Sequence, residues 1–396
     1  MQLDTGWLHH PFATSSFRIG SEDDLAVLRR LGPQRLHWLP ELSDMQPSPQ
    51  IPGGEAAKPE PAPSSGPGGA LPERVAAAAC QRQFEAVAEE LRAVYRVANG
   101  DPASAGDRTR ALVATLVDAV QSQGGLYIRS VPRTAGDIAV HGANVAVLSL
   151  LLGRAFDWPA ADLADIGAGA LLHDIGKLAE ARRHVRARTS QVRQGIEGDD
   201  AHVTKGVALV NAMGLSAAAA GVVADHHERA DGTGYPRGLR SDRMSAAARL
   251  VALVNHFDNL CSPVSGEAGL LPHEAMACLL QGSGRHDRGL LSAFVDAMGI
   301  YPAGSVVQLT DGRYALVTRL RRGRREAVRV QLLERLAPGD DPRCLDLVEP
   351  AVLGIARGVG LCDLPVDARA ALDPDRRPAY FWEPVTPKVD EADRPR

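Results

Sequence analysis

The sequence predicts a mainly α protein, a helical bundle with a small N-terminal α/β piece and a small C-terminal β-rich appendage. Apolar residues recur at helical spacing from about residue 73 to about residue 300, and the pattern changes to a period of two after Tyr301. The composition fits an Ala/Leu/Val-rich helical core, because 45% of the residues are hydrophobic and only 4% are aromatic. With 396 residues, the chain is long enough for more than one domain.

Changes in composition divide the chain. The N-terminal part combines a helix-like segment, Asp23–Leu31, with a strand-like one, Arg35–Leu39. A stretch rich in Pro, Gly and Ser follows and is expected to be disordered, because it has few large apolar side chains to bury. The predicted segments are a small α/β domain (1–45), a linker (46–72), the helical domain (73–300), a β-rich region (301–385) and a tail (386–396).

The β-rich region is predicted from alternating apolar and polar residues. Ser305–Leu309 and Arg313–Leu320 are joined by Asp311-Gly312, a dipeptide typical of tight hairpin turns. Ala327–Leu332 adds a third segment with the same alternation.

Charge and cysteine content exclude several classes of protein. The net charge of -4 gives no basic surface for a nucleic-acid polymer. The five cysteines show no Cys-x-x-Cys spacing, so we expect neither a disulfide framework nor a thiolate zinc site, and a reducing cytoplasm as the location. The longest apolar stretch, Val140–Phe156, is short and contains His141, Asn144 and Arg154, so we interpret it as a core helix and expect no membrane span.

Histidines and one aspartate recur in the helical region. His173 and Asp174 lie inside an apolar pattern, where a buried polar group needs a partner. Side chains of this kind come from at least four predicted helical segments, and such convergence builds metal centres in helical bundles. The alternative is a hydrogen-bonded core cluster, which a set of this size makes the weaker interpretation. The candidate ligands are His141, His173, Asp174, His202, His226 and His227.

The ligand types limit the possible metals but do not identify one. Imidazole and carboxylate without thiolate suit iron, manganese, zinc or nickel. Two divalent ions bridged by one carboxylate would explain why a single aspartate, Asp174, stands beside His173. Such a pair holds the attacking and leaving oxygens of a displacement at phosphorus. Lys177 lies one helical turn further on the same face, where its charge could stabilise a phosphoryl oxygen.

A glycine-rich loop follows the last two histidines. Asp231-Gly232-Thr233-Gly234 predicts a turn, and Pro236 fixes its exit. Tyr235 either lines a pocket beside the metals or anchors the loop on the core, and the sequence leaves both interpretations open. Gly176 beside Lys177 predicts a close approach of substrate or backbone.

Taken together, these motifs resemble the HD-GYP family, the metal-dependent branch of the HD phosphohydrolases. The resemblance covers roughly Asp137 to Gly299 and rests on His173-Asp174-x-Gly176-Lys177, the pair His226-His227 and Gly234-Tyr235-Pro236. It implies an HD-type helical bundle holding two divalent metal ions, usually iron or manganese. It also implies a cyclic di-GMP phosphodiesterase that hydrolyses the 3′,5′-phosphodiester to pGpG or GMP.

Roles follow from the resemblance residue by residue. It implies that His141, His173 and Asp174 hold the first metal, with Asp174 bridging, and that His202, His226 and His227 hold the second. Asp174 and Lys177 are then the expected catalytic residues. Gly234, Tyr235, Pro236 and Arg249 are expected to bind substrate, with a structural ion pair as the alternative for Arg249. Asp137 stands where members with three metals have a glutamate ligand.

Two departures from the family pattern support a second hypothesis. The family's metal-binding aspartate in the helix Ala247–Leu260 is replaced by Asn255, whose carbonyl oxygen carries no charge. The stretch after Lys177 lacks the usual pattern and offers Arg186 and Arg188 instead. The alternative function is therefore a degenerate HD-GYP domain, catalytically weak or inactive, that binds cyclic di-GMP or a partner protein.

The flanking segments resemble a subfamily. Trp7-Leu8-x-His10-Pro11-Phe12 is similar to a small domain of unknown function that precedes many HD-GYP domains, here missing its first strand. A GGDEF-type or other signalling protein is the expected partner, and a homodimer the expected assembly. His184, His256, His273 and His286 are interpreted as ordinary histidines.

Overall fold

The computed structural model describes residues 2–3, 36–37, 73–121, 126–133, 137–178, 199–263, 269–321, 328–334, 342–347, 353–372 and 377–384. The chain forms two units, Pro72–Val385 and, separately, Met1–Leu71 with Thr386–Arg396. In the second unit the described residues form one antiparallel pair, β1 (Gln2–Leu3) with β2 (Leu36–His37). The predicted linker, the tail and the helix expected over 23–31 lie outside the described residues.

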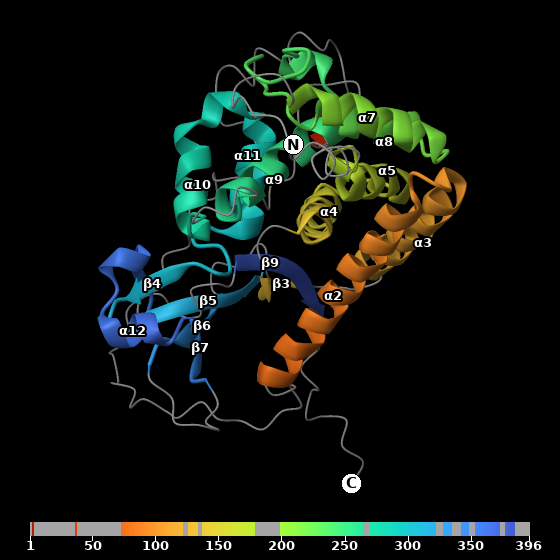
Figure 1. Ribbon diagram of the computed structural model, residues 1–396. Helices are drawn as coiled ribbons and strands as arrows, with labels where there is room; N and C mark the ends of the chain where they lie inside the picture. Colours follow the sequence, from red (N-terminus) through yellow and green to blue (C-terminus); the bar gives the residue numbers. More distant parts are fainter. Residues whose placement is uncertain are drawn as a thin grey trace, which may run out of the picture. The chain divides into compact units, whose positions relative to one another are not determined.

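The unit Pro72–Val385 is mostly helical, which confirms the predicted fold class. Short turns join the neighbouring helices α2 and α3, and α4 and α5, within one bundle (Figure 1). The described helices are α2 (Glu73–Val97), α3 (Pro102–Gln121), α4 (Ile138–Ala155), α5 (Ala160–Leu172), α7 (Asp199–Ala212), α8 (Ala217–Asp225), α9 (Ala246–Cys261), α10 (Pro272–Gln281), α11 (Arg288–Met298) and the short α12 (Val366–Ala370).

Helix α4 is the centre of the bundle. It contacts α2, α3, α5, α9 and α11, as well as strand β9 (Arg377–Pro384). A helix surrounded in this way is buried on all sides, and every residue of α4 from Ala139 to Gly153 is buried. By length and composition α4 could also cross a membrane, but 83% of its apolar window is buried inside this protein, as in a core helix.

Side chains cap α4, α8 and α9, which carry part of the candidate site. Asp137 Oδ1 accepts from the backbone N–H of Ala139 at 2.9 Å and begins α4. Ser216 and Ser245 begin α8 and α9 in the same way, each accepting at 3.0 Å from the backbone N–H three residues later. Each cap satisfies an N–H that the first helical turn leaves without an intrahelical partner, so the starts of these helices are fixed locally.

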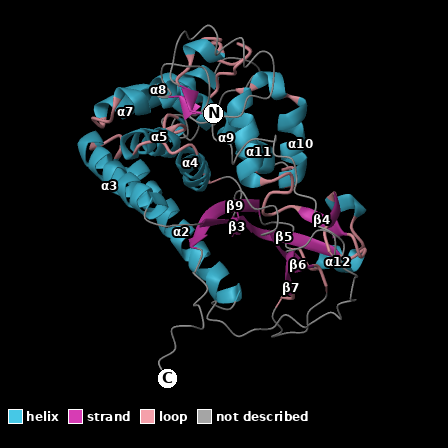
Figure 2. Cartoon of the chain, turned by 180° about the vertical axis from the view of Figure 1, so that it is seen from behind, coloured by secondary structure: helices cyan, strands magenta, loops and turns pink. Residues whose placement is uncertain are grey.

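An antiparallel sheet packs beside the helices (Figure 2). The predicted hairpin is confirmed as β4 (Val306–Leu309) and β5 (Tyr314–Arg321), with Gly312 at φ 89° in the turn. The predicted third segment is confirmed as β6 (Val328–Leu332), which pairs with β5. Strands β7 (Cys344–Leu347) and β8 (Ile355–Gly358) extend the sheet beside β6 and β4.

One strand of this sheet comes from the helical part of the chain. β3 (Leu126–Arg133) lies between α3 and α4 in sequence and pairs with both β5 and β9. All eight residues of β3 are in register with β9, from Leu126 opposite Pro384 to Arg133 opposite Arg377. β3 and β9 also contact α2, and β9 contacts α4, so these two strands join the sheet to the bundle.

Candidate metal centre

The first pair of ligands lies where α5 ends. His173 is the C-terminal cap of α5, and its Nδ1 donates to the backbone oxygen of Ala170 at 2.8 Å. This bond satisfies a carbonyl in the last turn and leaves the lone pair of Nε2 facing inward. Asp174 follows directly, and both side chains are buried.

The end of α8 repeats this arrangement. His226 caps α8, and its Nδ1 donates to the backbone oxygen of Val223 at 2.8 Å. His227 comes next, with its ring centroid 4.0 Å from that of His226. Two helices thus end on a buried imidazole whose Nε2 is free of a proton, the form in which histidine binds a metal.

His202 reaches the site because two backbones approach closely. A Cβ on Gly176 would lie 1.9 Å from the backbone oxygen of His202 and 2.8 Å from the nitrogen of Gly206, so only glycine fits there. The predicted close approach at Gly176 is therefore confirmed, and the neighbour is α7. With α7 seated in this way, His202 is buried beside Asp174.

His141 comes from α4. Its Nδ1 lies 2.6 Å from Asp258 Oδ2 on α9. A carboxylate oxygen at that distance accepts a hydrogen bond from the ring N–H at Nδ1, which leaves Nε2 as the ligand atom. That Nε2 is 3.0 Å from the Nε2 of His173.

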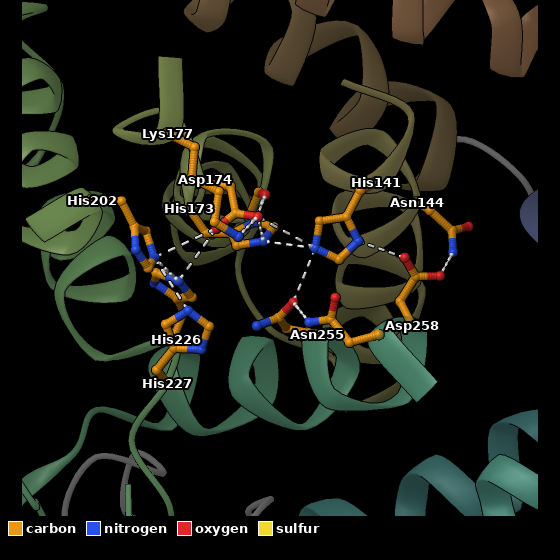
Figure 3. A network of polar contacts seen from close by, with 12 residues as sticks. His141, Asn144, His173, Asp174, Lys177, His202, His226, His227, Asn255 and Asp258 are labelled. Atoms are coloured by element: carbon orange, nitrogen blue, oxygen red, sulfur yellow. Dashed lines mark hydrogen bonds and ion pairs between the residues drawn. The ribbon is translucent and has the colours of Figure 1, made fainter. Parts of the chain in front are cut away.

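Asp174 lies between two groups of imidazoles (Figure 3). Its Oδ2 is 3.8 Å from the Nε2 of His141 and 3.6 Å from that of His173. Its Oδ1 is 3.6 Å from the Nε2 of His202 and 3.7 Å from that of His226. The first ligand group is His141, His173 and Asp174; the second is Asp174, His202, His226 and His227. One carboxylate thus has an oxygen for each group.

Asn255 stands at the edge of the first ligand group. Its Oδ1 lies 3.0 Å from the Nε2 of His141 and accepts from Asn259 Nδ2 at 2.8 Å. The amide oxygen therefore points to the place where the family pattern has a carboxylate. His256 does not replace it, because the Nδ1 of His256 faces His286 at 2.9 Å.

The chemistry of the donors fits a pair of cations. The Nε2 atoms of His202 and His226 are 3.4 Å apart, and those of His202 and His227 are 3.2 Å apart. Unprotonated nitrogens at such distances repel one another unless a positive charge lies among them. Asp174 Oδ1 is buried and makes no hydrogen bond in the structure, which is costly for a carboxylate without a cation.

Protonation states favour metal binding as well. Burial lowers the pKa of His173 to about 4 and that of His227 to about 3, so both rings are neutral near pH 7. Burial opposes the ionisation of Asp174, but electrostatic interactions with the His173 side chain and the Lys177 ammonium outweigh it and hold the pKa of Asp174 well below its usual value. The cluster therefore offers the neutral imidazoles of His173 and His227 and one ionised carboxylate, the forms that bind divalent metals.

Lys177 lies over this carboxylate. Its Nζ is 2.7 Å from Asp174 Oδ2, and 34% of its side chain is exposed, whereas Asp174 is only 2% exposed. The ammonium group thus stands between the buried carboxylate and solvent.

The loop after α8 lies against the second ligand group. The ring of Tyr235 stacks on His227, with ring centroids 4.5 Å apart. A Cβ on Gly234 would lie 2.4 Å from the nitrogen of Arg229 and 2.5 Å from the oxygen of His227, so the loop can reach this position only with glycine there. Pro236 follows through a cis peptide bond.

Glu228 holds the far side of the same loop. Its side chain is 2% exposed, and its two oxygens accept from the backbone N–H groups of Arg237 at 2.7 Å and Leu239 at 2.8 Å. Sequence analysis had not predicted this role, because the partners are backbone groups that carry no sequence signal.

Arg249 is not brought to the cluster. Its guanidinium donates to Ser241 Oγ at 3.0 Å and pairs with Asp287, the residue that caps α11. This is the structural ion pair that sequence analysis kept as the alternative. Asp137 is likewise engaged elsewhere, as the cap of α4 and the partner of Arg92 at 2.9 Å. Arg186 and Arg188 lie outside the described residues.

Two protein families match parts of this chain. Residues 126–290 match the family described as "HD domain", and residues 1–124 match "Domain of unknown function (DUF3391)". The "Cyclic di-GMP phosphodiesterase PA4108" of Pseudomonas aeruginosa is 29% identical over 326 residues, 78% of this chain and 76% of that protein.

Other relatives match over shorter lengths. The "3'3'-cGAMP-specific phosphodiesterase 3" of Vibrio cholerae is 30% identical over 148 residues, 37% of this chain and 31% of that protein. The "Cyclic di-GMP phosphodiesterase PdeB" of Borreliella burgdorferi is 21% identical over 197 residues, 48% of this chain and 51% of that protein. A solved structure from Bdellovibrio bacteriovorus, "Bd1817, a HDG"Y"P protein", covers 55% of this chain and 72% of its own at 19% identity and a TM-score of 0.41.

Proposed function

Because this chain is an HD-GYP family protein with an N-terminal DUF3391 domain, we propose that it hydrolyses a 3′,5′-phosphodiester bond of cyclic di-GMP. The proposed products are pGpG or GMP. The observation that carries the proposal is the position of Asp174, which offers one carboxylate oxygen to each of two imidazole groups.

The ligand residues of the site form two groups, one for each proposed metal ion. His141, His173 and Asp174, with the amide oxygen of Asn255, would hold one divalent ion, and Asp174, His202, His226 and His227 would hold the other. When bound, two such ions supply Lewis acidity to the phosphoryl oxygens and activate water. Iron or manganese is proposed, because the HD-GYP resemblance implies one of these metals and the imidazole and carboxylate ligands suit both.

Lys177 and the Gly-Tyr-Pro loop would receive the substrate. The partly exposed ammonium of Lys177 can approach a phosphoryl oxygen while it remains near Asp174, and it would stabilise negative charge that develops there. Tyr235 is held against His227 and would present its other face to a guanine base. The anchoring of this loop by Glu228 keeps that face in place before the substrate binds.

A second candidate function rests on Asn255. A neutral amide oxygen at this place lowers the negative charge of the first ligand group, so the chain could bind cyclic di-GMP or a partner protein with little turnover.

We also propose a cytoplasmic location, because none of the five cysteines forms a disulfide. The proposed partner is a GGDEF-type signalling protein.

The test is a hydrolysis assay on the full chain. Protein purified without oxygen and loaded with Fe²⁺ or Mn²⁺ should convert cyclic di-GMP to pGpG or GMP, measured by chromatography. Asp174→Asn, which removes the shared carboxylate, is the inactive control. Binding of cyclic di-GMP without turnover in metal-loaded protein would reject the enzyme and support the second candidate. Faster turnover of 3'3'-cGAMP would reject the proposed substrate.

A further inference from the structure

A line of buried hydrogen bonds connects the first ligand group to strand β9. The backbone N–H of Tyr380 donates to Asn144 Oδ1 at 2.6 Å, and Asn144 Nδ2 donates to Asp258 Oδ1 at 2.6 Å. Asp258 Oδ2 then accepts from His141 Nδ1 at 2.6 Å (Figure 3). His141 is 4% exposed, and the other three residues are fully buried.

The backbone N–H of Tyr380 determines which atom donates and which accepts in each hydrogen bond of this line. A backbone N–H can only donate, so the Asn144 oxygen must face Tyr380 and the Asn144 amino group must face Asp258. Asp258 therefore uses one oxygen for Asn144 and the other for the ring proton of His141. This places the proton of His141 on Nδ1 and leaves Nε2 for the first ligand group.

Strand β9 can supply this N–H because it is an edge strand. Among the described strands it pairs only with β3, where Tyr380 is opposite Ser130. Its other edge faces helices: two residues further on, the backbone oxygen of Trp382 accepts from Cys80 Sγ on α2 at 3.7 Å. Side chains of α2 and α4 thus form hydrogen bonds with backbone groups on this edge of β9. Asn144 is the one of these that also bonds to Asp258, the partner of His141.

We propose that Asn144 and Asp258 are positioning residues for the first metal ion, and that β9 holds them in place. The inference rests on the proposed function, since it concerns the same metal centre. It also explains how a group weakened by Asn255 can keep its ion, because a carboxylate behind an imidazole strengthens that imidazole as a ligand. The match to the HD domain ends at residue 290, so it does not include the strand that completes this support.

Binding of Mn²⁺ to the full-length protein tests the inference. Asn144→Leu removes both hydrogen bonds at similar volume, and Asn144→Ala does so with a smaller side chain in case leucine does not fit. Ser149→Ala is the matched control, because Ser149 lies on the same helix, is fully buried and has no hydrogen-bond partner for its hydroxyl among the described residues. Calorimetry gives the two Mn²⁺ affinities, and electron paramagnetic resonance distinguishes a coupled pair from an isolated ion.

In both Asn144 variants one Mn²⁺ should bind about tenfold more weakly, or weaker still, while the affinity of the other Mn²⁺ is unchanged. The electron paramagnetic resonance signal should become that of an isolated ion. Hydrogen exchange in the segment 377–384 should accelerate, whereas Ser149→Ala should behave as the natural protein. Unchanged affinities, or an equal loss at both sites with a lower melting temperature, would overturn the inference. Binding of two Mn²⁺ without turnover in the natural protein would reject the proposed function alone.

Discussion

Tyr235 stacks on His227 with an angle of 25° between the two rings, and its backbone N–H donates to the backbone oxygen of His227 at 3.2 Å. Sequence analysis left open whether this tyrosine lines a pocket or anchors the loop. The stack makes it an anchor, and the same contact places the ring beside the second ligand group. The loop and a candidate metal ligand therefore hold each other in position.

Removing the Tyr235 ring should weaken the second metal ion. Tyr235→Ala is expected to lower its affinity by roughly two- to tenfold, because an aromatic pair contributes about 0.5–1.5 kcal/mol. Tyr235→Phe keeps the stack and serves as the control, with Mn²⁺ titration as the measurement. Equal Mn²⁺ affinities in the two variants would contradict the role assigned to the stack.

Restoring a carboxylate at position 255 should strengthen the first ligand group. Asn255→Asp places a charged oxygen where the amide oxygen now lies, 3.0 Å from the Nε2 of His141. We expect at least tenfold tighter binding of the weaker Mn²⁺ and a rise in the rate of cyclic di-GMP hydrolysis. Asn255→Ala should change both in the opposite direction. If Asn255→Asp binds Mn²⁺ no more tightly and hydrolyses cyclic di-GMP no faster than the natural chain, Asn255 does not weaken the first ligand group.

A methyl group at Gly176 should disturb the docking of α7. The added Cβ would meet the backbone oxygen of His202 at 1.9 Å, so Gly176→Ala should cost about 1–3 kcal/mol in the free energy of unfolding and displace a metal ligand. Gly221→Ala on α8 is the matched control, because nothing lies within 4 Å of the added atom. The control should stabilise by about 0.5–1 kcal/mol, since alanine is the better helix former. Urea unfolding measures both, and similar changes in the two variants would count against the close approach.

Acid should weaken the cap of α4. Burial opposes ionisation of Asp137, but hydrogen bonds from Arg92 and from backbone N–H groups outweigh it and lower its pKa below the usual 3.8. A carboxyl group whose pKa is lower in the folded state stabilises the protein above the unfolded value, and this contribution is lost as pH falls through the folded value. Asp137→Ala should cost about 1 kcal/mol at pH 7 and less at pH 3. Asp137→Asn keeps the capping hydrogen bond and should lower the free energy of unfolding by less than Asp137→Ala. Thermal unfolding at the two pH values therefore separates the contribution of the capping hydrogen bond from that of the charge. A cost independent of pH would exclude the electrostatic part.

Local patterns predicted the helices, and the candidate ligands that they indicated lie close together in the structure. His173 and Asp174 could be found because two polar side chains interrupt an apolar helical repeat, and the hairpin at Gly312 because its turn residues are adjacent in sequence. The first and second ligand groups contain all the histidines that the family resemblance implied.

Features that depend on distant partners could not be predicted. β3 begins with three consecutive apolar residues and contains Pro132, so it shows no clear alternation, and it is a strand because β5 and β9 pair with it from far along the chain. Asn144 looked like an interruption of an apolar helix, since its partners lie on α9 and β9. Arg249 was expected either at the substrate or in a structural ion pair, and it pairs with Asp287, a partner that the local sequence does not identify.

The separation of 236 residues between Asn144 and Tyr380 has a consequence for biosynthesis. Contacts between residues so far apart form late, because the ends of a long loop must first be brought together. As the nascent chain leaves the ribosome, the helices bearing the imidazoles emerge well before the strand that steadies one of them. A polypeptide released before β9 is made would keep the shared aspartate and lack the support behind His141, so β9 must be synthesised before the centre can mature.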